Sequence, residues 1–293
     1  MAAVFNAHDR KITHNCLIRI QSVYETLKSA EKRAADFMLN HPAAIAGTTI
    51  TEAAALANCS EATLVRLARK LGYSGYPELK VSISENHHDA GSGILYEEIA
   101  STDTPLTVAE KVFQTSLRSL MDTFNLLDER QYQEALTCIM KANRILLIGS
   151  GDAHIVAYTG FLKFSRIGLN AICSMDFDIQ LIEASKMNEK DIIIAVSHTG
   201  RTQTLQEVIR EAKKHGAVII TITNYPTSPL AKLSDVVLLT AAFVPDNQGE
   251  IMSKRIPELC ILESLYINII MRSRKDVAGT LSRSNLAVRT NKI

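Results

Sequence analysis

Two short segments of the sequence combine glycines with side-chain hydroxyl groups. One spans residues 149–151, with the sequence Gly-Ser-Gly, and the other spans residues 197–202, with the sequence Ser-His-Thr-Gly-Arg-Thr. Glycine lets the backbone approach a ligand closely, and the free amides at the start of a helix attract anions. Hydroxyl groups add hydrogen-bond donors without a fixed charge, a combination suited to a phosphate monoester. The predicted phosphate-binding residues are Ser150, Gly151, Ser197, Thr199, Gly200 and Thr202.

These loops lack the patterns of two common nucleotide sites. Residues 149–151 supply Gly-x-Gly without the third glycine of a dinucleotide fingerprint, and the Gly-Lys-Ser/Thr of a triphosphate loop is absent. We therefore predict no nucleotide cofactor. The five cysteines lie far apart and include no Cys-x-x-Cys, so the sequence predicts neither a zinc site nor a disulfide framework.

Each hydroxyl-rich loop follows a short run of apolar residues, and segments with helical patterning separate these runs. The runs occupy residues 145–148, 171–173, 192–196, 218–222 and 236–239. Strands buried on both faces by crossover helices have this pattern, and right-handed crossovers assemble them into an open, doubly wound parallel sheet. Ligands of such sheets bind outside the carboxyl ends of the strands. We therefore predict a C-terminal α/β domain with both loops at its binding edge.

The first 85 residues show helical periodicity, capping residues and no convincing period-two strand, which predicts an all-α bundle. A short helix capped by Thr49 or Thr51 is followed by the tight turn at 58–60 and a second helix at 61–71. This layout is typical of a helix-turn-helix, whose second helix enters the major groove. The predicted DNA-contacting residues are Ser60, Glu61, Ala62, Thr63, Arg66, Arg69 and Lys70, with Lys80 as a further candidate for phosphate contact. A helical adaptor that does not bind DNA is the alternative interpretation.

Composition limits the class of protein. The chain has 293 residues, with 32 Lys and Arg against 31 Asp and Glu. This balance excludes nucleic-acid binding through bulk charge, although a small module can still bind locally. No apolar run is long enough to span a bilayer, and the first ten residues lack the layout of a secretory signal. We therefore expect a cytoplasmic protein with no membrane contact.

Polar segments divide the chain. Residues 86–93 favour turns and loops, and a polar tail begins after Arg272. The predicted organisation is a helix-turn-helix domain at 1–85, a linker at 86–105, an α/β domain with its leading helix at 106–275 and a tail at 276–293.

The segments described above resemble RpiR-family bacterial transcriptional regulators. Residues 60–66 and 69–76 are similar to that family's recognition helix and its Gly-Tyr/Phe-x-Gly-Tyr/Phe sequel, and residues 144–239 with the helix near 256–271 resemble a flavodoxin-like SIS (sugar isomerase) domain. The resemblance implies a regulator that binds operator DNA of a sugar uptake or catabolism operon and responds to a sugar phosphate. It also implies that Gln180 and Ser253 face the sugar. Segments 108–127 and 256–270 resemble the helices through which SIS domains pair, so we expect a homodimer or homotetramer.

A sugar-phosphate isomerase is the main alternative function. Such an enzyme needs a general base and acid near the phosphate, and the available groups are Glu183, His154 and His198. Enzymes with this domain resemble one another in a Glu and a His-Gly-Asp element after the second strand, which residues 174–183 lack. We therefore predict a regulator without catalytic residues.

Overall fold

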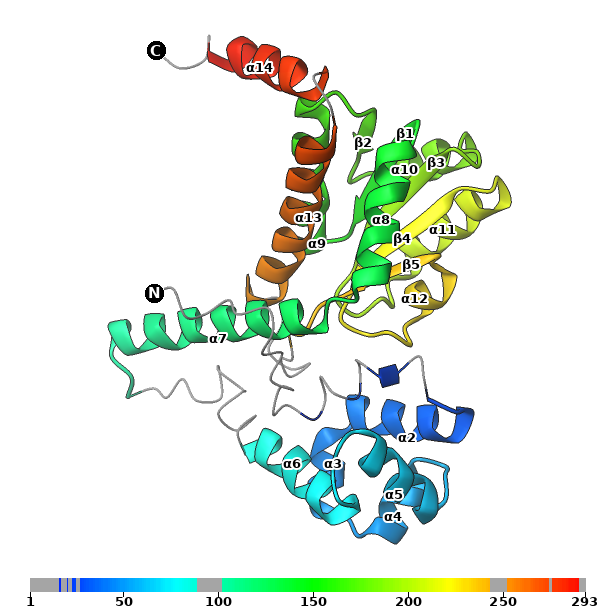
Figure 1. Ribbon diagram of the computed structural model, residues 1–293, viewed down its shortest axis with the longest axis vertical. Helices are drawn as coiled ribbons and strands as arrows, with labels where there is room; N and C mark the ends of the chain where they lie inside the picture. Colours follow the sequence, from blue (N-terminus) through cyan, green and yellow to red (C-terminus); the bar gives the residue numbers. More distant parts are fainter. Residues whose placement is uncertain are drawn as a thin grey trace. The chain divides into compact units, whose positions relative to one another are not determined.

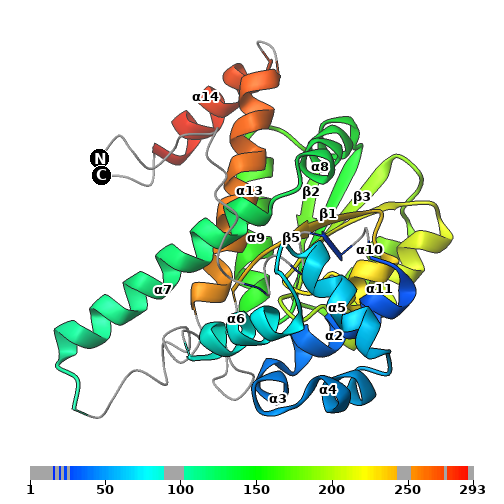
Figure 2. The same cartoon turned by 60° about the horizontal axis from the view of Figure 1, so that its bottom comes forward.

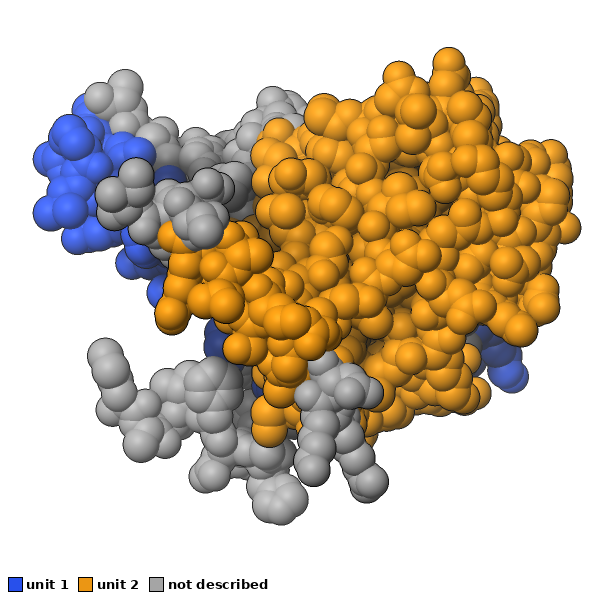
Figure 3. Space-filling view, turned by 90° about the horizontal axis from the view of Figure 1, so that it is seen from above, with its two compact units in different colours: residues 1–126, 243–249 blue, residues 127–242, 250–293 orange. Residues whose placement is uncertain are grey.

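The computed structural model describes residues 16, 20, 23, 24, 27–88, 102–242, 252–273 and 276–289. The chain divides into two compact units, Met1–Leu126 with Phe243–Gly249 and Leu127–Ala242 with Glu250–Ile293, which Figure 3 colours separately. The division at residue 126 groups the helix that begins at Pro105 with unit 1, whereas the sequence analysis joined it to the second domain. The limits predicted from the sequence for the functional domains stay predictions.

The described part of unit 1 is entirely helical, as Figures 1 and 2 show. Its helices are α2 (Ser29–Asn40), α3 (Pro42–Gly47), α4 (Ile50–Leu56), α5 (Glu61–Lys70), α6 (Tyr76–His88) and α7 (Pro105–Leu126). Helices α2 to α6 enclose one apolar core, in which Met38, Leu64, Leu67 and Leu79 are fully buried. The predicted all-α bundle is confirmed.

Unit 2 contains a five-stranded, fully parallel sheet with the order β2-β1-β3-β4-β5. The strands are β1 (Arg144–Gly149), β2 (Ala171–Cys173), β3 (Asp191–Val196), β4 (Val218–Thr223) and β5 (Val236–Leu239). Each of the five predicted apolar runs forms one of these strands, so the predicted α/β fold is confirmed. Gly149 pairs with Val196 at the end of the β1–β3 ladder, which brings the carboxyl ends of these strands together.

Helices cover both faces of this sheet (Figure 1). On β1, Ile145 and Leu147 pack into one apolar cluster and Leu146 and Ile148 into another, because successive side chains of a strand point to opposite faces. The first cluster includes α8 (Glu129–Lys141), α9 (Asp152–Arg166) and α13 (Met252–Arg272). The second includes α10 (Phe177–Ser185), α11 (Gln203–Lys214) and α12 (Pro229–Leu233).

The segment predicted as a polar tail contains α14 (Asp276–Arg289), which packs against α9. Val277 and Leu281 join the apolar cluster beneath it, and Ser284 Oγ donates a hydrogen bond of 2.9 Å to the carbonyl of Arg166. These contacts tie the helix to unit 2.

Candidate functional site

The loop between β1 and α9 is shaped by its two glycines. A Cβ atom on Gly149 would lie 2.5 Å from the carbonyl oxygen of Ala153, and Gly151 has a φ of +58°, which L side chains rarely adopt. Ser150 is exposed between them, and no side chain caps the amino end of α9. The loop therefore holds a hydroxyl group and a helix start next to the end of β1.

The loop between β3 and α11 brings further hydroxyl groups to the same edge. Ser197 Oγ accepts a hydrogen bond from the Gly200 amide at 3.2 Å and lies 3.4 Å from Thr202 Oγ1. Gly200 has a φ of +60°, and a Cβ atom there would lie 2.1 Å from Ser228 Oγ. Thr199 is exposed, and its Oγ1 accepts a hydrogen bond from the Arg201 amide at 3.3 Å. The tight turn depends on glycine because both its backbone angle and its surroundings exclude a side chain.

An open cleft with a cavity volume of about 140 Å³ lies beside the first of these loops. Three of the predicted residues, Ser150, Gly151 and Gln180, line it. His154, considered above as an acid or base for an isomerase, also lines the cleft. The remaining lining residues, which were not predicted to bind a ligand, are Gly149, Met175, Phe177, Thr204 and Leu205. Thr204 continues the hydroxyl pattern of the 197–202 loop, so that signal was present in the sequence. Met175 and Phe177 carry no comparable signal, because an apolar residue after a strand is more often part of the core.

His154 and Gln180 supply polar groups to the cleft. Burial lowers the pKa of His154, so its imidazole is neutral near pH 7, and its ring stacks on Tyr158 with centroids 6.1 Å apart. Gln180 is 3% exposed, and its Nε2 donates a hydrogen bond of 2.7 Å to the carbonyl of Ser174. The side chain of Gln180 is therefore held in place at the cleft wall.

A second polar group of residues is buried near the start of α13. Burial, followed by the charges of Lys254 and Arg255, lowers the pKa of His198 to about 3. Arg255 Nη1 contacts both carboxylate oxygens of Glu258, at 3.1 and 3.0 Å, and these two side chains are 4% and 0% exposed. Ser253 is 3% exposed, and neither its Oγ nor His198 Nδ1 has a hydrogen-bond partner among the described residues. Ser253 is not among the residues that line the cleft.

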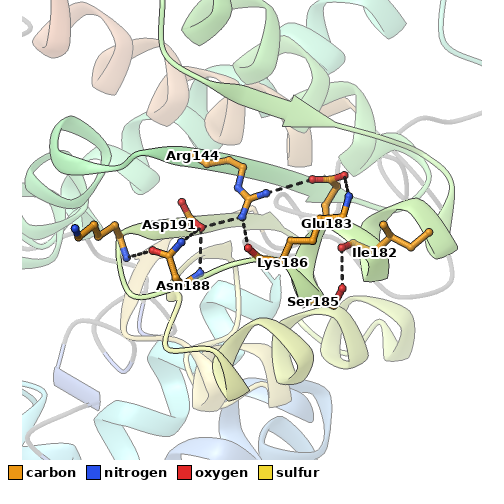
Figure 4. Close-up of polar contacts among 8 residues, drawn as sticks. Arg144, Ile182, Glu183, Ser185, Lys186, Asn188 and Asp191 are labelled. Carbon is orange, nitrogen blue, oxygen red and sulfur yellow. Dashed lines mark hydrogen bonds and ion pairs between the residues drawn. The ribbon is translucent and has the colours of Figure 1, made fainter.

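Glu183, considered above as a base for an isomerase, lies beside Arg144 and Asp191 (Figure 4). Arg144 Nη1 is 3.5 Å from Glu183 Oε2, and Arg144 Nη2 is 2.9 Å from Asp191 Oδ2. Arg144 and Asp191 are the first residues of β1 and β3, whereas the cleft follows the last residue of β1. A six-residue strand separates its ends by roughly 16 Å. Glu183 therefore stabilises the amino edge of the sheet.

The turn that joins α4 to α5 has the predicted geometry. Asn58 has a φ of 49°, in the left-handed region that asparagine tolerates better than most residues. Ser60 is the N-cap of α5, and its side chain accepts a hydrogen bond from the Thr63 amide at 3.3 Å. These contacts fix the start of α5 relative to α4.

The predicted DNA-contacting side chains on α5 differ in exposure. Ser60, Glu61, Ala62, Arg66, Arg69 and Lys70 are exposed, whereas Thr63 is only 2% exposed. The Thr63 hydroxyl lies 2.9 Å from Ser60 Oγ and accepts a hydrogen bond of 3.2 Å from Arg66 Nη2. A contact between Thr63 and a DNA base stays a prediction. In the structure, the Thr63 hydroxyl holds the side chain of Arg66.

Contacts within unit 1 occupy several of the charged groups. Lys80 Nζ donates a hydrogen bond of 2.6 Å to the carbonyl of Thr48, and Lys70 Nζ lies 3.5 Å from Glu31 Oε2. Thr51 donates a hydrogen bond of 2.6 Å to Glu61 Oε1. Arg69 has no such contact within the described part of the chain. Arg66 and Arg69 are therefore the cations of α5 most accessible to a phosphate backbone.

Within the described ranges, no cluster of three or more His, Cys, Asp or Glu side chains is arranged to hold a metal ion. No helix in the same ranges combines the length and apolar character needed to cross a membrane.

The two parts of the chain match two known families. Residues 14–89 match the helix-turn-helix domain of the rpiR family, and residues 138–265 match the SIS domain. An HTH-type transcriptional regulator of Thermotoga maritima is 33% identical over 271 residues, covering 92% of this chain and 96% of that protein. The HTH-type transcriptional regulator RpiR of Escherichia coli is 29% identical over 245 residues, covering 84% of this chain and 82% of that protein.

A solved structure resembles nearly the whole chain. The Vibrio vulnificus NanR protein, in complex with ManNAc-6P, superimposes with a TM-score of 0.62 and 25% sequence identity. The match covers 95% of this chain and 100% of the NanR chain.

Proposed function

The chain belongs to the rpiR family of helix-turn-helix transcriptional regulators, and on this premise we propose that a phosphorylated sugar bound by unit 2 controls operator binding by α5. One observation supports the proposal that unit 2 binds a phosphorylated sugar. The pairing of Gly149 with Val196 places the two hydroxyl-rich loops next to each other at the carboxyl edge of the sheet.

The carboxyl edge of the sheet offers neutral hydrogen-bond donors for a phosphate group. Ser150, Ser197, Thr199 and Thr202 supply hydroxyl groups, and α9 and α11 each begin beside them without a side-chain cap. Helix amino ends favour anions through their free amides and dipole. The phosphate sits on these groups, with Gly151 and Gly200 allowing close backbone approach, and the sugar extends toward Gln180 and Ser253. The complex of NanR with ManNAc-6P is a precedent for a sugar phosphate in a similar fold.

The operator is bound by the exposed face of α5. Ser60, Glu61 and Ala62 begin the helix, where recognition helices place side chains near base edges. Arg66 and Arg69 are exposed one and two turns later, and Lys70 is exposed at the end of the helix. We assign base readout to the helix start with Arg66, and phosphate contact to Arg69 and Lys70.

Regulation follows from a shift between conformations of a homo-oligomer. Ligand binding changes how two copies of unit 2 pair, and the segment before Arg144 carries this change to the spacing of the two recognition helices. The functional domains in this scheme are residues 1–85 for DNA, 86–105 as linker, 106–275 for the sugar phosphate and 276–293 as tail.

A sugar-phosphate isomerase is the second candidate because His154 lines the cleft. Proton transfer between sugar carbons needs a general base near the bound sugar. Glu183 is held by Arg144 at the opposite edge, and His198 is 7% exposed beside two cations. This arrangement favours a sensor over an enzyme.

Selection of bound fragments from the source genome by the full-length protein, at two salt concentrations, tests the proposal. Specific operator sites survive salt that removes non-specific binding. We expect one or a few two-fold symmetric sites whose occupancy changes with one member of a panel of hexose, pentose and amino-sugar phosphates. Absence of enriched fragments at both salt concentrations, with and without the sugar phosphates, would reject the proposal of a transcriptional regulator. Isomerase assays on the same sugar phosphates would then test the alternative function.

A further inference from the structure

The wall of the cleft beside the β1–α9 loop carries no ionised side chain. The described residues that line it include no Asp, Glu, Lys or Arg, and the imidazole of His154 is neutral near pH 7 because burial lowers its pKa. A free ammonium or an additional carboxylate on the ligand would lose water in this cleft without gaining an opposite charge. The part of the ligand that enters the cleft is therefore uncharged.

His154 offers the cleft a hydrogen-bond donor. Its Nδ1 lies 3.9 Å from Sγ of Cys173, the last residue of β2. Burial raises the pKa of the Cys173 thiol to about 11, so the thiol keeps its proton and donates a weak hydrogen bond to Nδ1. A neutral imidazole that accepts at Nδ1 carries its hydrogen on Nε2. Within the described part of the chain no group bonds to Nε2, which leaves this N–H for a ligand.

Gln180 offers the cleft a hydrogen-bond acceptor. Its Nε2 donates to the carbonyl of Ser174, and this bond fixes which way the side-chain amide points. The Oε1 atom has no partner among the described residues and remains accessible. Because Gln180 lines the cleft, it presents a fixed carbonyl oxygen to an N–H or O–H group of the ligand.

Two apolar side chains, Met175 and Phe177, complete the wall. Met175 is 73% exposed and belongs to none of the apolar clusters of the described residues, so its thioether does not contribute to a core. The turn that carries it is held by a hydrogen bond of 3.1 Å from the Asp176 amide to Ser174 Oγ. An alkyl group of the ligand gains from contact with this surface, whereas a hydroxyl group would lose water there.

A secondary amide with a small acyl group matches all three features of the wall. Its N–H donates to Gln180 Oε1, its carbonyl accepts from His154 Nε2, and its alkyl end contacts Met175. A sugar hydroxyl supplies a donor and an acceptor but no alkyl group, and a free amine adds a charge. The cavity of about 140 Å³ is comparable to one of roughly 150 Å³ that holds a benzene ring, and an acetamido group is smaller than that ring.

We propose that the cleft takes the N-acyl group of an acylated amino-sugar phosphate, with the amide between Gln180 and His154 and the acyl group against Met175 and Phe177. The inference rests on the proposed function, because the phosphate of the same ligand occupies the hydroxyl-rich loops. It adds the class of sugar, since those loops alone serve a hexose, a pentose or an amino-sugar phosphate equally well.

The first test is calorimetric titration of the full-length protein with N-acetylglucosamine 6-phosphate, glucosamine 6-phosphate and glucose 6-phosphate. These three compounds differ only in the group at one ring carbon, and the corresponding mannose derivatives provide the other configuration at that carbon. In one of the two series, we expect the N-acetyl compound to bind about tenfold or more tightly than both of the other compounds, because it alone buries an alkyl group and makes both amide hydrogen bonds.

The outcomes separate this inference from the proposed function. Equal affinities within both series, or tighter binding of the amine or of the plain hexose phosphate, would overturn the inference and leave the proposed function standing. Binding of a pentose phosphate alone would have the same consequence. If no sugar phosphate of the wider panel binds, the proposed function fails and the inference fails with it.

The second test is Met175→Ser, which removes the exposed part of the apolar wall. Met175 belongs to no apolar cluster of the described residues, so we expect the variant to fold. The affinity for the N-acetyl compound should fall about fivefold or more, and the affinity for the matching hexose phosphate should stay within about twofold. Met271→Ser is the matched control, because Met271 is 79% exposed on α13 and does not line the cleft. An unchanged preference in Met175→Ser, or an equal loss in Met271→Ser, would refute the placement of the acyl group.

Discussion

The Arg66 guanidinium donates a hydrogen bond of 3.2 Å to the hydroxyl of Thr63, one turn earlier on α5. Thr63 is buried, and its hydroxyl lies 2.9 Å from the N-cap hydroxyl of Ser60. Ser60 caps the helix by accepting from the Thr63 amide, and the Thr63 hydroxyl orients an exposed cation on the outer face of α5. Arg66 is held before DNA arrives, so less side-chain entropy is lost on binding.

Removing Arg66 should weaken operator binding. We expect Arg66→Ala to lower affinity by about 5- to 150-fold, equivalent to about 1–3 kcal/mol, with the response to the sugar phosphate retained. Thr63→Val, which removes the supporting hydroxyl and keeps the shape, should give a smaller loss. Fluorescence anisotropy with the selected operator measures both. Arg210→Ala is the control because Arg210 is exposed on α11, and an equal loss in that variant would contradict the assignment.

Removing a hydroxyl group from the carboxyl edge of the sheet should make DNA binding insensitive to the sugar phosphate. We expect Ser197→Ala to weaken sugar-phosphate binding by about 10- to 100-fold, because a hydrogen bond to a charged group contributes about 1.5–3 kcal/mol. Calorimetric titration measures the ligand affinity, and operator affinity without ligand should stay within twofold of the native value. The exposed Ser185, at the end of α10, provides the control Ser185→Ala. Loss of DNA binding by folded Ser197→Ala protein would argue against a separate sensor site.

Gly200 should be intolerant of any side chain. In Gly200→Ala, the new Cβ atom would lie 2.1 Å from Ser228 Oγ at a φ of +60°, so the loop must move. We expect a loss of about 2–4 kcal/mol in the free energy of unfolding, measured by urea denaturation. Gly47→Ala is the matched control, because nothing lies within 4 Å of its added Cβ, and on α3 it should stabilise the chain by about 0.5–1 kcal/mol. Equal effects of the two changes would be inconsistent with the geometry.

Stability should fall as the pH drops below the ordinary pKa of histidine. The pKa of His198 is lowered from 6.5 to about 3, so between these values the unfolded chain binds a proton that the folded chain does not. The free energy of unfolding is therefore unaffected by His198 above pH 6.5 and decreases as the pH falls toward 3. The decrease between pH 7 and pH 5 is about 2 kcal/mol. Urea denaturation at these two pH values measures the slope.

The variant His198→Gln should remove most of this pH dependence. His215→Gln serves as the control because His215 is exposed at the end of α11. A slope that is unchanged in His198→Gln would show that other groups cause the pH dependence.

Local spacing in the sequence was sufficient for much of the fold. The five apolar runs predicted all five strands, since a strand buried on both faces needs only a continuous apolar segment. Asn58 and Ser60 predicted the turn before α5, because left-handed dihedrals and helix capping depend on neighbouring backbone alone. The glycines at 149, 151 and 200 likewise indicated tight loops at strand ends.

Other properties depended on long-range packing. Lys80, a candidate for phosphate contact, bonds to the carbonyl of Thr48, 32 positions away. Glu183 follows the second strand in the sequence but is drawn to the amino edge by Arg144. Such contacts join residues whose separation along the chain carries no signal.

Helix α7 illustrates the same division. Its sequence by itself indicated an apolar helix, with Phe113 and Leu117 four positions apart on one face. Only the tertiary structure decided that the small polar face, with Ser119, is buried and the large apolar face is exposed. Periodicity defines the two faces of a helix, whereas the face that is covered depends on which elements, distant in the sequence, pack against it.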